Sequence, residues 1–127
     1  MRQAGRITAA ARAAAARAVR PRVTTGEIDK IVRNTIEKAG AKPSFLGYGG
    51  FPGSACVSIN DEVIHGIPSR SRVIHEGDIV KVDVGAYING FHGDCACTIP
   101  CGEVSEEARK LIAGTRQSFY EGIKFSR

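Results

Sequence analysis

Residues 77–98 read GDIVKVDVGAYINGFHGDCACT, and this stretch predicts a β-hairpin. Residues 79–88 are rich in β-branched side chains, and residues 91–98 form a second extended run. Asn89-Gly90 between the two runs is a dipeptide typical of a tight two-residue turn, which requires positive φ angles. The sequence therefore predicts two antiparallel strands that pair around Asn89 and Gly90.

A two-residue turn fixes which side chains of the hairpin share a face, because directly opposed residues lie on the same side and side chains alternate along each strand. One face then carries Asp83, Gly85, Tyr87, His92, Asp94 and Ala96. The other face carries Val82, Val84, Ala86, Ile88, Phe91, Gly93, Cys95 and Cys97. Asp83 and Asp94 are diagonal neighbours on the first face, with Cα atoms roughly 7–8 Å apart.

Two carboxylates at this distance repel each other, and leaving them half-buried without compensation is costly. A cation, a shared proton or a pair of basic partners would compensate them. We expect no Lys or Arg on the same hairpin face, which favours a cation, and we expect Gly85 to leave room for metal and substrate near the backbone. Two edge aspartates that face water are the alternative, and a β-bulge would move one of them to the other face.

The composition is that of one globular domain. With 127 residues, 43% of them hydrophobic and 24% charged, the chain has room for one modest core and is not disordered. No stretch approaches the roughly 18 apolar residues of a membrane helix. Six arginines precede residue 23 and the net charge is +5. We interpret this cluster as a solvated helix face, because no aromatic residue interrupts it to stack on nucleic-acid bases.

The same Ala- and Arg-rich start superficially resembles a transit peptide, but it contains no Ser. We expect a helix that begins the fold of a cytoplasmic protein. The cysteines agree with a reducing compartment: CACTIPC at 95–101 lacks the C-x-x-C pair of a zinc knuckle. We expect Cys56, Cys95, Cys97 and Cys101 to be buried free thiols, and Cys95 and Cys97 have no functional explanation.

Helices are predicted before and after these strands in the sequence. Residues 2–19 form an Ala-rich helix that Pro21 ends. Thr24 and Glu27 form a capping box for a second helix that ends at Gly40. Its apolar stripe consists of Ile28, Ile31, Val32 and Ile36. After a short strand at 56–59 and the hairpin, Ser105 caps a last helix. We expect its buried side to consist of Ala108, Leu111, Ile112, Thr115 and Phe119.

This order predicts a single α+β domain over residues 1–127, with helices on one face of a mostly antiparallel sheet. For two parts of the chain, the sequence allows both a functional and a structural interpretation. Residues 43–53, PSFLGYGGFPG, form either a pocket loop or a surface turn whose aromatic residues pack on the core. His65, between apolar residues, is either a core histidine or a functional one. His75 is expected to be exposed and without function, whereas His92 is a candidate for supporting a metal ligand or contacting substrate.

Three stretches in this order resemble the N-terminal half of type I methionine aminopeptidases. They are FLGYGGFPGSACVSIN at 45–60, VIHGIPS at 63–69 and GDIVKVDVGAYINGFHGDCACT at 77–98. The resemblance covers nearly the whole chain. It implies half of a pita-bread (creatinase/aminopeptidase-like) fold, two pseudo-symmetric halves around two metal ions. It also implies metal-dependent removal of the initiator methionine from nascent proteins.

By this resemblance, Asp83 and Asp94 match two metal ligands of a site for two divalent ions. Carboxylate ligands do not determine which ions these are, and Co, Mn, Fe and Zn are all compatible. His65 matches the histidine that contacts the substrate and stabilises the transition state. Three residues match the wall of the methionine pocket: Tyr48, Phe51 and Cys56. The implied partners are nascent peptides with an N-terminal methionine and the nearby ribosome, without membrane or specific nucleic-acid binding.

The resemblance also implies one His and two Glu ligands from a second half, and these 127 residues contain none of those motifs. We therefore expect this chain by itself to be inactive and to self-associate through an exposed apolar half-interface. A non-catalytic binding module of the same fold, which contacts nascent peptide, ribosome or RNA, is the alternative. Retention of Asp83, Asp94 and His65 argues for the enzyme, and GYGGFPGSACVSIN and HGIP argue against a prolidase-type relative.

Overall fold

The computed structural model describes residues 1–126. In chain order it contains α1 (Arg2–Ala18), α2 (Thr25–Lys38), β1 (Lys42–Pro43), the 3₁₀ turn η1 (Tyr48–Gly50), β2 (Ala55–Ile59), β3 (Ile79–Ile88), β4 (Phe91–Pro100) and α3 (Glu106–Ile123). All strand pairs are antiparallel, and β3 pairs with β4 along one edge and with β1 and β2 along the other. None of the described helices is both long and apolar enough to cross a membrane.

The predicted hairpin is confirmed residue by residue. β3 and β4 pair without a bulge from Ile79 opposite Pro100 to Ile88 opposite Phe91. The turn residue Asn89 has a φ of 52°, and Gly90 after it also has a positive φ. The side-chain faces expected from the sequence are therefore the faces of the folded sheet.

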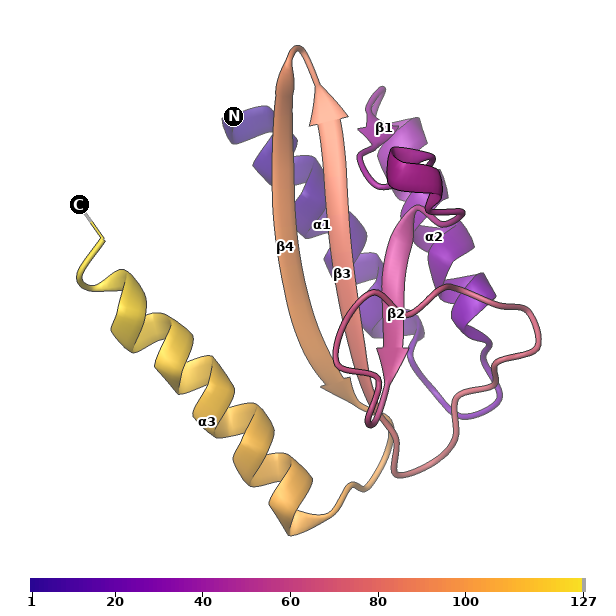
Figure 1. The fold of residues 1–127 in the computed structure, drawn as a ribbon, viewed down its shortest axis with the longest axis vertical. Coiled ribbons are helices and arrows are strands. Elements are labelled where there is room, and N and C mark those ends of the chain that lie inside the picture. The colour runs from indigo at the N-terminus through magenta and orange to yellow at the C-terminus, as the bar shows by residue number, and fades with distance from the viewer. Residues whose placement is uncertain (127) are drawn as a thin grey trace.

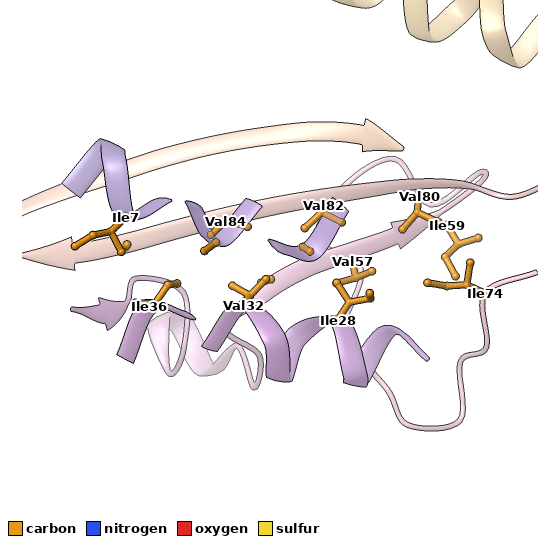
Figure 2. Close-up of a cluster of buried hydrophobic side chains, with 14 of the residues drawn as sticks. Ile7, Ile28, Val32, Ile36, Val57, Ile59, Ile74, Val80, Val82 and Val84 are labelled. Carbon is orange, nitrogen blue, oxygen red and sulfur yellow. The ribbon is translucent and has the colours of Figure 1, made fainter. Parts of the chain in front are cut away.

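Helices α1 and α2 cover one face of this sheet (Figure 1). The capping box at the start of α2 is confirmed, because the Thr24 hydroxyl accepts a bond from the Glu27 N–H and the Glu27 carboxylate accepts one from the Thr24 N–H. Between helices and strands lies one apolar layer (Figure 2). Its largest members are Ile7, Ile28, Val32, Ile36, Val57, Ile59, Ile74, Val80, Val82 and Val84.

The last helix differs from the prediction. Ser105 does cap α3, with its hydroxyl accepting a bond from the Ala108 N–H at 3.1 Å. However, α3 has no buried residue and extends away from the sheet (Figure 1). Of the five residues expected on a buried side, Ala108 and Ile112 are half-buried; Leu111, Thr115 and Phe119 are exposed. Periodicity predicts an apolar side correctly, but the packing partner of that side is not among residues 1–126.

The prediction for the cysteines is correct for two of four. All four are free thiols, and Cys56 and Cys101 are buried, but Cys95 and Cys97 are only half-buried. The reason is that β4 is an edge strand, which α1 covers from one side only. Burial still raises the pKa of both half-buried thiols, and the nearby charge of Arg12 opposes the rise.

Helix α1 approaches β4 most closely at Gly93, which yields a stability prediction. A Cβ at Gly93 would lie 2.6 Å from the Ala4 carbonyl carbon and 2.6 Å from Thr8 Oγ1. We expect Gly93→Ala to lower the free energy of unfolding by about 1–3 kcal/mol through overpacking, measured by urea denaturation. Gly5→Ala on α1 is the control: a Cβ there meets nothing within 4 Å. It should raise the free energy of unfolding by about 0.5–1 kcal/mol. Equal stability of wild type and Gly93→Ala would contradict this contact.

Candidate active site on the open face of the sheet

The face of the sheet turned away from α1 and α2 carries the aspartate pair. In the strand register, Cys56 of β2 lies opposite Asp83, and Gly85 lies opposite Asp94. Asp83 and Asp94 are therefore diagonal neighbours on one face, as predicted. Their role as metal ligands stays a prediction at this point.

The two carboxylates have different surroundings. Asp94 is exposed, whereas Asp83 is half-buried and its buried Oδ1 has no hydrogen-bond partner. Burial raises the pKa of Asp83, the charge of Asp94 raises it further, and the Val84 N–H and His65 oppose the rise. A buried oxygen without a partner costs free energy, and a cation between two carboxylates would remove that cost. The donor set thus fits a metal ion with oxygen ligands.

One premise of the metal prediction was wrong. By register, Lys81 shares the face of Asp83, although no basic residue was expected there. The Lys81 Nζ instead donates a hydrogen bond to the carbonyl oxygen of Asn60, at the end of β2. Among the described residues, neither Asp83 nor Asp94 forms an ion pair. Lys81 therefore does not compensate the two carboxylates, and a cation remains the predicted compensation.

The sequence suggested open space over Gly85. The loop after β1 fills that space instead. A Cβ at Gly85 would lie 2.7 Å from Phe45 Cε1 and 2.8 Å from Ser44 Cβ. The Ser44 N–H also donates to the Gly85 carbonyl oxygen at 2.9 Å. Gly85 therefore admits an aromatic ring beside Asp94, rather than metal or substrate.

This packing favours the pocket interpretation of the loop at residues 43–53, since Phe45 lies over the open face and not in the core between sheet and helices. Phe51 is half-buried. Tyr48 is 82% exposed, so the alternative in which Tyr48 packs against the core is wrong. Cys56 is buried next to Asp83. Burial, followed by the charges of Asp83 and Asp94, raises the pKa of Cys56 to about 11, so its thiol is neutral at pH 7.

His65 is exposed, so its interpretation as a core histidine was wrong. It has a φ of 59°, which is uncommon outside glycine and often marks a functional position. The next residue, Gly66, accepts a bond from the Val57 N–H at 3.0 Å and donates one to Ser58 Oγ at 2.9 Å. A Cβ at Gly66 would lie 2.8 Å from the Ser58 Cα, so only glycine permits this approach. The loop is thus fixed to β2, and the charge of His65 reaches Asp83.

Of the other two histidines, His92 shares the face of Asp94 on β4, and His75 lies in a turn outside the hairpin. His92 Nδ1 is hydrogen-bonded to Ser44 Oγ at 2.9 Å, and its ring stacks on Tyr87 with centroids 4.7 Å apart. It thereby connects the hairpin to the loop over Gly85, and its proposed supporting role stays a prediction. His75 is exposed in a turn and lies 3.8 Å from Asp78, as expected for a residue outside the site.

Sequence reasoning missed Asp29. Its Oδ1 accepts bonds from the N–H groups of Ser54 at 2.6 Å and Ala55 at 2.9 Å, and so holds the start of β2 against α2. The only signal was an acidic residue between the buried Ile28 and Val32 of α2. Residues 1–126 contain no group of three or more His, Cys, Asp or Glu side chains able to hold a metal ion. The aspartate pair by itself is smaller than such a group.

Comparison with known proteins identifies the family of this chain. The whole chain, residues 1–127, matches metallopeptidase family M24. It is 54% identical over 124 residues to a methionine aminopeptidase of Clostridium acetobutylicum, covering 98% of this chain and 50% of the relative. It is 48% identical to methionine aminopeptidase 1 of Bacillus subtilis with the same coverage. The chain thus spans about half the length of these curated relatives.

A solved methionine aminopeptidase from Thermotoga maritima superposes with a TM-score of 0.97 at 38% identity, over 100% of this chain and 51% of that structure. This likeness confirms the expected α+β architecture as half of a pita-bread fold. Together with the family match over the full chain, it establishes that this chain belongs to metallopeptidase family M24.

Proposed function

We propose that this chain provides one half of the active site of a metal-dependent methionine aminopeptidase, which removes the initiator methionine from nascent proteins. The observation that carries the proposal is the buried, unpartnered Oδ1 of Asp83 beside Asp94. A binding module of the same fold has no need for such a costly pair of carboxylates. The relatives are twice as long, so we infer that a second half completes the ligand set.

Asp83 and Asp94 would hold divalent cations, two of them in the proposed complete site, with Co, Mn, Fe or Zn all compatible with carboxylate oxygens. When bound, such cations polarise the scissile carbonyl and lower the pKa of water. Sites of this kind work best when their hydrogen-bond donors are held in place before the reaction. His65, fixed through Gly66 to β2, is our candidate donor to the carbonyl oxygen as it gains negative charge.

The loop and β2 would supply the methionine pocket. Cys56, opposite Asp83, and the half-buried Phe51 are our candidates for its wall, and the neutral Cys56 thiol is a soft surface for a thioether. Tyr48 is our third wall residue and would have to close over the substrate, because it is exposed here. The substrates would be nascent peptides with an N-terminal methionine, met in the cytoplasm near the ribosome.

The aspartate pair predicts weak Mn²⁺ binding by the chain alone. We expect Asp83→Asn and Asp94→Asn each to reduce the affinity at least about 10-fold, since even groups that only support a ligand contribute that much. Titration of Mn²⁺ followed by electron paramagnetic resonance measures the free ion. Asp61→Asn, in an exposed turn, is the matched control and should bind as the wild type does. Undiminished binding by the Asp83→Asn/Asp94→Asn double variant would refute the ligand assignment.

The incomplete ligand set predicts that the chain alone releases no methionine from a Met-Ala-Ser peptide. Mixed with the separately expressed C-terminal half of the Clostridium acetobutylicum relative, it should regain metal-dependent release. In that complex we expect His65→Ala to lower kcat by about 10²–10³, the usual cost of losing one such donor. His75→Ala is the control and should keep full activity.

Two results would contradict the proposal. One is methionine release by the pure chain without a second half. The other is a folded complex of the two halves in which His65→Ala and wild type have the same kcat.

A further inference from the structure

Two cysteines on β4 form a second cluster of potential ligands, on the opposite side of the sheet from the aspartates. Cys95 lies opposite Val84 and Cys97 opposite Val82, so both thiols face the layer under α1. Both are half-buried free thiols. Because the pairing has no bulge, the two residues are regular alternate positions of one strand, about 6.6–6.8 Å apart along it.

This spacing does not suit a disulfide. A disulfide requires Cβ atoms about 3.5–4.5 Å apart, whereas Cβ atoms of alternate strand residues are separated by about twice the rise per residue. An ion between the two sulfurs bridges the gap instead. Two collinear metal–sulfur bonds of about 2.3 Å span about 4.6 Å, which two thiols reach by turning toward each other.

The ligand count selects the kind of ion. A structural zinc ion takes four ligands, and no third His, Cys, Asp or Glu joins this pair within residues 1–126. Thiolates prefer soft ions such as Cu(I), and Cu(I), unlike zinc, is stable with just two sulfur ligands in a line. Hard divalent ions prefer the oxygens of Asp83 and Asp94 on the other face.

Helix α1 brings a positive charge to the same place. It runs alongside β4 in the same direction (Figure 1), and the two touch at Ala4 and Gly93. Eight residues further along the helix, about 12 Å, is Arg12. Four residues further along the strand, about 13 Å, is Cys97. Arg12 is therefore level with the thiols. Burial raises the pKa of both thiols, and the charge of Arg12 opposes that rise.

Arg12 has no counter-ion among the described residues. It is half-buried, it forms no ion pair, and α1 contains no acidic residue. A half-buried guanidinium without a partner is costly, so an anion beside it is stabilising. Two thiolates that share one monovalent cation carry a net charge of −1, which Arg12 neutralises.

We propose that Cys95 and Cys97 form a two-coordinate Cu(I) site, with Arg12 neutralising the bis-thiolate complex. On binding, two Cu–S bonds form and both thiol protons leave to solvent, while copper stays in the +1 state. The site is independent of the aspartate pair, so metallopeptidase activity and Cu(I) binding are separable.

Competition for Cu(I) with the chromogenic chelator bicinchoninate, under anaerobic conditions, tests the proposal on the 127-residue chain. A Cys56→Ala/Cys101→Ala background leaves Cys95 and Cys97 as the only cysteines, and we expect it to hold one Cu(I) per chain. Adding Cys95→Ser or Cys97→Ser should lower the affinity at least about 10-fold. Arg12→Gln should also weaken binding, whereas Arg17→Gln, on the exposed side of α1, should not.

In the background chain, Cys95→Ser and Cys97→Ser together should abolish tight Cu(I) binding. The proposal is wrong if the background chain with and without these two replacements binds Cu(I) with the same affinity. Equal affinities of Arg12→Gln and Arg17→Gln would overturn the role of Arg12. If circular dichroism finds the background unfolded, single Cys95→Ser and Cys97→Ser variants of the wild type decide the matter. Each should then bind one Cu(I) fewer than wild type, and unchanged stoichiometry in both would refute the site.

Discussion

The uninterrupted antiparallel pairing of β3 and β4 determines what lies on each side of this molecule. Because side chains alternate, the same register that sends Val82 and Val84 into the layer under α1 sends Asp83 to the open face beside Asp94. A slip of one residue would bury the carboxylates among apolar side chains and expose the valines. Helix α1 holds this register from outside, since its backbone fits against β4 only where residue 93 has no side chain.

The open face is organised differently from the helical one. Two irregular segments cover part of it, and each is held at a glycine that admits a close approach: Gly85 beneath Phe45, and Gly66 against β2. These segments bring an aromatic ring and His65 near the aspartates and leave Asp94 exposed. The result is a regular sheet on which the negative charge of Asp83 is unfavourable, because of its burial and the nearby charge of Asp94. Such a combination is typical of sites where stability is given up for ligand binding.

The sequence predicted those features that local chemistry determines. The Asn89-Gly90 turn, the alternation beyond it and the capping box of Thr24 and Glu27 depend on residues a few positions apart, and all are present. The diagonal aspartates follow from the same local register, with no need for tertiary information.

Most of the wrong predictions depend on tertiary contacts, and the exception is the face of Lys81, which follows from strand alternation alone. The occupant of the space over Gly85 comes from residues 44 and 45, and the ammonium of Lys81 is held by a carbonyl at the end of another strand. His65 looked like a core residue because its neighbours are apolar, but Ile64 and Ile67 are themselves exposed. The apolar side of α3 has the expected period, yet nothing within residues 1–126 buries it.

The ionised form of Asp83 costs the fold stability, and a bound cation would remove that cost. The pKa of Asp83 is raised in the folded state, so its charge lowers stability above the ordinary carboxyl pKa, and this loss disappears as the pH falls below that value. The most direct measurement is the free energy of unfolding of wild type and Asp83→Asn between pH 7 and pH 3, with and without Mn²⁺. Without the ion, the variant should be the more stable at pH 7, with the difference closing on acidification. With Mn²⁺ at pH 7, only the wild type should gain stability. A variant that is less stable than wild type at pH 7 without metal would contradict the account.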